Sequence, residues 1–235
     1  DGACLQIGFG DIPDAVAELI IHSDLKDLGI HTELMGDGIM SLYKAGKITG
    51  AKKQLQPGKI TAGIAFGSQE FYAFMRECPD LHMTVSSYTN NPTVIAQNDH
   101  VVGINAFLDI SLAGDVNAES VGGQTFSGTG GHLDFAIGAQ GSKNGKSILC
   151  GPSTYVQKDG TRVSRIVAAL PPNATVTTPR SCMHYVCTEY GIVNLRGRTI
   201  PERAELLIGI AHPDFREALI RDAEQMGIWR PRNRR

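Results

Sequence analysis

Short apolar runs alternate with helix-like segments along the first half of this 235-residue chain, and this alternation limits the folds open to it. Residues 4–7 and 29–34 read as strands, each followed by a glycine-containing turn and a helical segment, the second of these over residues 38–45. The pattern resumes with strands at residues 60–66 and 81–87 and a helix between them that Ser68 caps. Because such units form sheets covered by helices, the sequence predicts an open α/β sheet with flanking helices.

The rest of the chain mixes turns with shorter elements. Residues 47–59 are rich in lysine, lack periodicity, and are the best candidate for a linker or a long surface loop. Asn90 and Asn91 precede Pro92, which predicts a turn or a cap opening a short helix. A hairpin is expected from residues 101–110 and 112–119. Further strands are predicted at 147–149, 165–170 and 175–178, and helices at 200–211 and 213–226.

Composition excludes several classes of function. A net charge of −2 argues against binding to nucleic acids or membrane surfaces, and no apolar run is long enough to span a bilayer. Seven histidines show no metal-ligand spacing, so no metal is expected. The five cysteines form no CxxC pair, which favours reduced thiols in the cytoplasm; they are Cys4, Cys78, Cys150, Cys182 and Cys187.

The first strand leads into a turn with the pattern Gly8-x-Gly10. Asp11 is predicted to cap the following helix, and Pro13 suits its first turn. Such a turn is typical of a dinucleotide-binding loop, but the third glycine is absent. A tight strand-to-helix connection and a contact with an anionic ligand at the helix N-terminus both fit, and a nucleotide-binding oxidoreductase domain is kept as an alternative.

Two stretches carry the strongest chemical signal. In residues 29–38 a strand ends in a lone carboxylate, Glu33, before a glycine-flanked turn. Residues 120–131 are rich in glycine and can present main-chain N–H donors to an anion, although a wide β-turn with a bulge is the structural alternative. Together a carboxylate nucleophile and backbone donors are what acyl transfer through a covalent carboxylate requires. His132 is expected to open a new buried element after the glycines.

A second isolated acid is Glu189, which interrupts an apolar run before Gly191. Buried acids rarely lack a partner, and Arg196 or Arg198 could supply one. A structural ion pair and a role in an active site are both kept as interpretations.

Several ordered motifs together resemble the acetyl-CoA hydrolase/transferase family. They are GIHTELMGDG (29–38), QPGKI (56–60), NNP (90–92), the NDHVVGIN run (98–105), GDVNAES (114–120), SGTGGHLDF (127–135) and TEYGIVNLRGRT (188–199). The resemblance covers essentially the whole chain but only the C-terminal half of family members. It implies a fold of the class I CoA-transferase (NagB/RpiA-like) type with its first lobe truncated. Residues 1–46 would end the N-terminal lobe, 47–59 would be the linker, and 60–235 the C-terminal lobe.

The resemblance also implies roles for individual residues. Glu33 takes the position of the family's covalent nucleophile, which forms a glutamyl-CoA thioester, and Gly131 that of an oxyanion donor. His132 departs from the Gln or Ser that relatives often carry after the paired glycines. Coenzyme A contacts fall on the GFGDI turn, Phe107 and the glycine loop, namely Gly8, Phe9, Gly10, Asp11, Ile12, Phe107, Ser127 and Gly131. Glu33 is expected within reach of residues 127–131.

The function implied is CoA transfer between an acyl-CoA, 4-hydroxybutyryl-CoA or another short acyl-CoA, and a carboxylate such as acetate. Coenzyme A is then a substrate, and a homo-oligomer or a missing N-terminal lobe is expected to complete the enzyme, which as this fragment could be inactive. An acyl-CoA hydrolase on the same scaffold and a non-catalytic acyl-CoA-binding half remain alternatives, since water reaching the thioester would suffice for hydrolysis.

Overall fold

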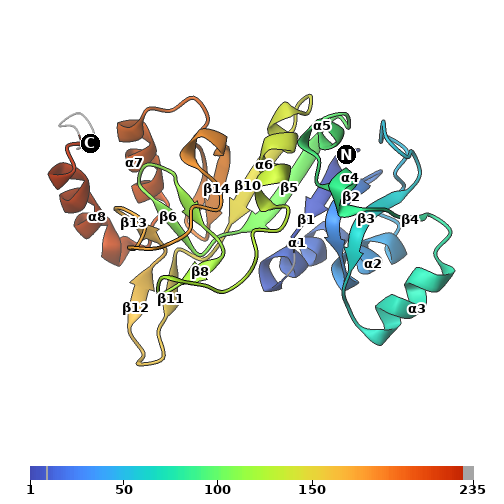
Figure 1. Ribbon diagram of the computed structural model, residues 1–235, viewed down its shortest axis with the longest axis horizontal. Coiled ribbons are helices and arrows are strands. Elements are labelled where there is room, and N and C mark those ends of the chain that lie inside the picture. Colours follow the sequence, from blue (N-terminus) through green and yellow to red (C-terminus); the bar gives the residue numbers. More distant parts are fainter. Residues whose placement is uncertain (9, 230–235) are drawn as a thin grey trace. The chain divides into compact units, whose positions relative to one another are not determined.

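The computed structural model describes residues 1–8 and 10–229. The chain divides into two compact units, the first formed by residues 1–105 and 134–148 and the second by 106–133 and 149–235. Figure 1 labels their helices and strands.

A predominantly parallel sheet forms the centre of the first unit. Its strands are β1 (Cys4–Ile7), β2 (Gly29–Met35), β3 (Ile60–Ala65), β4 (Leu81–Met83), β5 (Val101–Ala106) and β10 (Lys146–Cys150), in the order β10-β5-β1-β2-β3-β4. Strand β1 pairs in parallel with β2 and β5. Strand β3 pairs in parallel with β2 and β4. The predicted open α/β sheet is confirmed.

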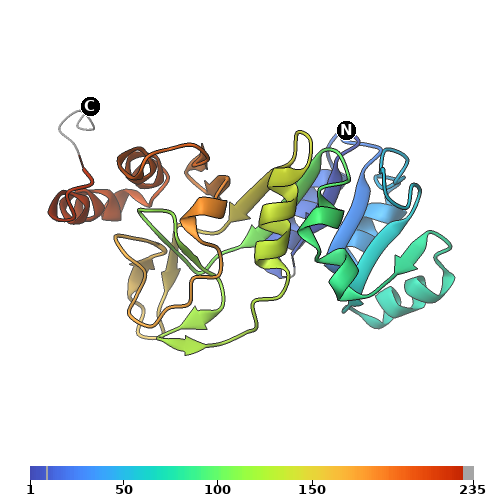
Figure 2. The ribbon, with the colours of Figure 1, turned by 45° about the horizontal axis from the view of Figure 1, so that its top comes forward.

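Helices cover both faces of this sheet (Figures 1 and 2). On one face lie α1 (Asp11–Ile21), α2 (Asp37–Lys44) and α3 (Gln69–Glu77), packed against alternate strand residues such as Leu5, Ile30 and Ile60. The other face carries α5 (Pro92–Ile95) and α6 (His132–Gly141), which bury Ile95 and Phe135 against β1 and β5. The short helix α4 (Ser86–Thr89) packs on β2 and β3.

The predicted caps and boundaries are confirmed in part. Ser68 Oγ accepts a hydrogen bond from the main-chain N–H of Phe71 at the start of α3, as expected. Asp11 as the cap of α1 is wrong, because Gly10 takes the capping position and Asp11 is the first helical residue. The strand expected over residues 81–87 ends at Met83, since the chain turns into α4 and packs onto the neighbouring strands.

Residues 47–59 form an irregular connection that is held against the sheet by buried side chains and hydrogen bonds. Ile48 and Lys53 are each only 5% exposed. The ammonium group of Lys53 donates to the carbonyls of Ile30 and Lys59, each at 2.7 Å, and to Thr61 Oγ1 at 2.9 Å. Burial lowers the pKa of Lys53 to about 8. The division of the chain into lobes around this segment stays a prediction.

Several short strands and hairpins build the second unit. Its elements are β6 (Asp109–Ser111), β7 (Val116–Asn117), β8 (Ser120–Val121), β9 (Gln124–Thr125), β11 (Thr154–Val156), β12 (Arg162–Ser164), β13 (Ile166–Val167), the 3₁₀ helix η1 (Arg180–Cys182), β14 (Tyr185–Thr188), β15 (Gly191–Asn194), α7 (Ile200–Gly209) and α8 (Pro213–Gln225). The expected hairpin is confirmed only between β6 and β7, with Ile110 opposite Val116. Residues 101–106, predicted to belong to it, instead form β5 of the parallel sheet beside β1. The strand predicted over residues 175–178 is wrong, because Thr178 makes a single bridge to Val116.

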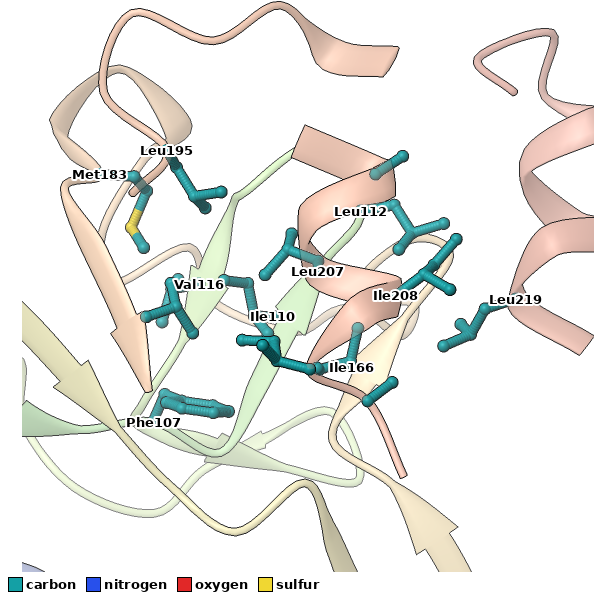
Figure 3. Packing of buried hydrophobic residues seen from close by; sticks show 14 of the residues in the cluster. Phe107, Ile110, Leu112, Val116, Ile166, Met183, Leu195, Leu207, Ile208 and Leu219 are labelled. Carbon is teal, nitrogen blue, oxygen red and sulfur yellow. The ribbon is translucent and has the colours of Figure 1, made fainter. Parts of the chain in front are cut away.

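Side chains from these separate elements share one hydrophobic core, which Figure 3 shows. Ile110 and Val116 of the hairpin meet Ile166 of β13, and Leu207 of α7 is fully buried beside them. Burying a side chain of this size stabilises the folded state by ~1.5–3 kcal/mol. This packing compensates for strands that are too short to be stable alone.

Candidate active site

Glu33 lies near the carboxyl end of β2, which has β1 on one side and β3 on the other. Open α/β sheets bind their ligands at this end of the strands. The side chain is half-buried, and its Oε1 accepts a hydrogen bond of 2.9 Å from Nδ2 of Asn90, the residue that follows α4. Glu33 is therefore placed and oriented as a partly shielded carboxylate.

A second carboxylate, Asp134 of α6, lies close enough to Glu33 for their charges to interact. Burial raises the pKa of Asp134, and the negative charge of Glu33 raises it further. The two acids therefore oppose each other's charge in the first unit. Any chemistry that neutralises Glu33 relieves that repulsion.

His31 lies two residues before Glu33 on the same strand and is 1% exposed. Its Nε2 contacts the carbonyl oxygen of Thr89 at 3.0 Å. Because a carbonyl only accepts, Nε2 carries the proton of the neutral ring. Burial is the main cause that lowers the pKa of His31 to about 4, so the ring is neutral near pH 7.

The predicted CoA-binding turn connects β1 to α1. Gly8 donates its N–H to the carbonyl of Ile104 at 2.9 Å, and Ile12 is half-buried. Gly10 has a φ of 118°, a conformation open to glycine and strained for other residues. Phe9 lies outside the described residues. A cavity of about 50 Å³ borders this turn and Leu34 of β2, which is room for water but not for a nucleotide.

The glycine-rich stretch serves two purposes in the second unit. Gly122 and Gly123, with φ of 60° and 79°, form the two-residue turn between β8 and β9. Residues 120–125 therefore form a β-turn, as the structural alternative predicted, but the turn is a tight two-residue one rather than a wide one. Ser127 is exposed, whereas Gly131 is buried in the turn that leads directly into α6.

Glu119, which the sequence analysis did not single out, anchors this stretch. It is 5% exposed, and its carboxylate accepts hydrogen bonds from Thr129 Oγ1 at 2.9 Å and Thr177 Oγ1 at 3.0 Å. Its main-chain oxygen accepts from the N–H of Phe126 at 2.7 Å and of Ser127 at 3.3 Å. The available signal was an acid, the second in the motif GDVNAES, directly before the glycine-rich residues 120–131.

Phe107, a predicted CoA contact, and His132, the residue after the paired glycines, are both largely structural. Phe107 as a whole residue is 3% exposed, with its ring in the core shown in Figure 3, so its predicted contact with CoA stays a prediction. His132 opens α6 as predicted, and its Nε2 donates to the carbonyl of Ala106 at 3.1 Å while Nδ1 contacts Thr178 Oγ1 at 2.9 Å. Burial lowers the pKa of His132.

Glu189 lies between β14 and β15 and has a partner that the sequence did not predict. Ser153 donates to its carboxylate through the main-chain N–H at 2.8 Å and through Oγ at 2.6 Å. These bonds replace the ion pair expected from Arg196 or Arg198. Glu189 is exposed, not buried as the sequence suggested. Desolvation acts to raise its pKa, but the hydrogen bonds from Ser153, with smaller contributions from its own main chain and the charge of His212, leave the pKa lowered.

The structure thus brings Glu33 together with Asn90 and Asp134, two residues that the sequence analysis did not place in the site. Glu33 and Gly131 belong to different units, and their predicted convergence stays a prediction. Among residues 1–8 and 10–229, no three His, Cys, Asp or Glu side chains are grouped so that they could hold a metal ion. Over the same described residues, every helix is too short or too polar to cross a membrane.

Comparisons with known proteins identify the same relatives by sequence and by structure. The family model for the acetyl-CoA hydrolase/transferase C-terminal domain matches residues 67–223. A probable butyrate:acetyl-CoA coenzyme A-transferase from Syntrophomonas wolfei is 50% identical over 100% of this chain and 52% of its own length. A 4-hydroxybutyrate coenzyme A transferase from Clostridium kluyveri is 46% identical over 94% of this chain and 51% of its own.

A solved structure agrees with these matches. The crystal structure of 4-hydroxybutyrate CoA-transferase from Porphyromonas gingivalis has a TM-score of 0.81 and 42% identity, covering 96% of this chain and 52% of that one. The chain spans about half the length of the curated relatives it matches.

Proposed function

Because the chain belongs to the acetyl-CoA hydrolase/transferase family, we propose that it carries the nucleophile of an acyl-CoA:carboxylate CoA-transferase, and that this nucleophile is Glu33. The observation that carries the proposal is the position of Glu33 at the carboxyl end of a central parallel strand, oriented by the amide of Asn90. A carboxylate attacks a thioester without needing a base to deprotonate it.

The reaction proceeds through four covalent exchanges, two that load CoA onto Glu33 and two that pass it to the acceptor. Glu33 attacks the thioester carbonyl of the acyl-CoA, and the C–S bond breaks to release CoA thiolate and leave a mixed anhydride. The thiolate then attacks the glutamyl carbonyl, which releases the acyl group as a carboxylate and leaves a glutamyl-CoA thioester. An acceptor carboxylate reverses these steps, so that a new acyl-CoA and free Glu33 result. No net proton is taken up or released.

Asp134 gives this route an electrostatic advantage. The carboxylate of Glu33 opposes the charge on Asp134, whereas its anhydride and thioester are neutral. Formation of the covalent intermediates therefore removes a repulsion that the free enzyme contains. The amide of Asn90 still finds an acceptor oxygen on Glu33 in each of these forms.

The proposed contacts with CoA and with the oxyanion come from the segment after β1 and from main-chain groups of the second unit. The segment from Gly8 to Ile12 leads into the N-terminus of α1 and includes its first residues, and the helix dipole favours phosphate groups there. The main chain of Phe107, Ser127 and Gly131 completes the proposed contacts. Gly131 is the proposed oxyanion donor, since it directly precedes α6. The names of the relatives support butyryl, 4-hydroxybutyryl and acetyl groups as candidate acyl groups.

The test uses the protein as its gene encodes it. Wild type incubated with butyryl-CoA and then borohydride should carry an alcohol at Glu33, because borohydride reduces a thioester and leaves ordinary carboxylates intact. Glu33→Gln should show neither this mass change nor transfer, since an amide forms no anhydride. Acetate is added or omitted in parallel, because CoA release without acetate would indicate hydrolysis. An active protein with an unmodified Glu33 would contradict the covalent mechanism.

A further inference from the structure

Helix α4 packs closely on β3, the neighbour of the strand that carries Glu33, because Gly63 of β3 has no side chain. A Cβ atom at Gly63 would lie 2.7 Å from Thr89 Oγ1 and 3.3 Å from the carbonyl oxygen of Glu33. Thr89, the last residue of α4, is fully buried by this approach. The close contact places a buried hydroxyl behind the nucleophile.

A continuous series of hydrogen bonds connects this hydroxyl to Glu33. Thr89 Oγ1 donates to Oδ1 of Asn90 at 2.9 Å, which is the shorter of its two acceptor contacts, the other being the carbonyl of Ser86 at 3.4 Å. Nδ2 of Asn90 donates to Oε1 of Glu33 at 2.9 Å. The carbonyl of Thr89 in turn accepts from Nε2 of His31 at 3.0 Å. The series starts and ends on β2, at two residues of the same strand.

We propose that Thr89 and His31 are positioning residues, which hold the amide of Asn90 with its nitrogen toward Glu33. This inference rests on the proposed role of Glu33 as nucleophile. An amide can turn by 180° at little intrinsic cost, and the turned form would place Oδ1 against the carboxylate. The hydroxyl of Thr89 opposes this, because it donates to the oxygen and so favours the orientation in which nitrogen faces Glu33.

His31 fixes the other end of the arrangement. Its ring hydrogen bond holds the main chain at Thr89, and therefore the starting point of the Asn90 side chain. The rings of Phe135 and Tyr88 lie near the imidazole, with centroids 6.3 Å and 6.1 Å away. A buried side chain packed near two aromatic rings and held by a hydrogen bond supplies the rigid support that an oriented nucleophile needs.

The test compares Thr89→Val, which keeps the size but removes the hydroxyl, with Thr89→Ser, which keeps the hydroxyl. Formation of the Glu33 thioester is measured in single turnovers with butyryl-CoA, using the protein as its gene encodes it. Thr89→Val should slow this step by roughly 10- to 100-fold with KM unchanged, as expected for a misplaced reacting group. Thr89→Ser should restore most of the rate. Thr32→Val is the matched control, because Thr32 is equally buried on β2 and bonds to Leu34 instead.

A double-mutant cycle separates positioning from a general loss of folding. If Thr89 acts through Asn90, Thr89→Val should slow the reaction no further in an Asn90→Ala protein, whereas a folding defect would slow both backgrounds alike. Thr89→Ala replaces Thr89→Val if the latter does not fold. Additive effects, or a Thr89→Val protein as fast as wild type, would overturn the positioning role and leave the proposed function intact. A wild type that forms no thioester would instead overturn the proposed function.

Discussion

His31 should make the stability of the protein depend on pH in the mildly acidic range. The ring is 1% exposed, and its burial lowers the pKa from 6.5 to about 4. In the unfolded chain the ring titrates near its ordinary pKa, so between these values the unfolded state binds more protons than the folded state. The stability contributed by the neutral buried ring is therefore fully present above pH 6.5 and is lost as the pH falls toward 4. At about 1.4 kcal/mol for each pKa unit, roughly 2 kcal/mol should be lost between pH 7 and pH 5.

The assay is urea denaturation of wild type and His31→Gln at pH 7, 6 and 5 and constant ionic strength, followed by circular dichroism. Glutamine keeps an N–H donor for the Thr89 carbonyl and carries no charge in this range. From pH 7 to pH 5 the unfolding free energy of wild type should fall by about 2 kcal/mol more than that of His31→Gln. The control is His22→Gln, whose side chain is 74% exposed and pairs with Glu18 on the surface. If wild type and His31→Gln lose stability in parallel, the reasoning fails.

Two further predictions concern packing and capping. Gly138→Ala should lower the free energy of unfolding by ~1–3 kcal/mol, because the new Cβ would lie 2.6 Å from Cβ of Ile95. Gly209→Ala, with open space at its Cβ, should not lower it, and an equal loss in both would contradict the steric argument. Ser68→Ala removes the cap of α3 and should cost about 1 kcal/mol in urea denaturation, whereas Ser68→Gly should cost only a few tenths.

Much of the first unit could be predicted from local sequence patterns. Apolar runs such as residues 29–34 identified the parallel strands, and Ser68 and Asn91 act as helix caps in the structure. The end of β4 could not be predicted, because residues 84–89 (TVSSYT) favour extended structure by local propensity. Their helical turn depends on the space above Gly63, which only the neighbouring strand provides.

Residues of the candidate site could be predicted only where a single stretch of sequence contains all the features that mark them. Glu33 stood out as a lone acid at the end of an apolar strand. Asn90 was interpreted as a turn residue, and its neighbour Asn91 does cap α5, so the local pattern was already explained. The contact of Asn90 with Glu33 joins positions 57 residues apart and becomes visible only in the folded chain. Glu119 and Asp134 were missed for the same reason, since their partners come from distant segments.

The buried ammonium group of Lys53 has a mechanical consequence for the site. Its hydrogen bonds to Ile30 on β2 and Thr61 on β3 cross from one strand to the next, and a third bond, to the carbonyl of Lys59, closes the connecting segment on itself. Sliding β2 past β3, or lifting the segment away, would leave a charge in the interior with lost acceptors. Residues 47–59 therefore behave as a clamp rather than a hinge. Any movement that brings a substrate to Glu33 has to carry both strands and this clamp as one body.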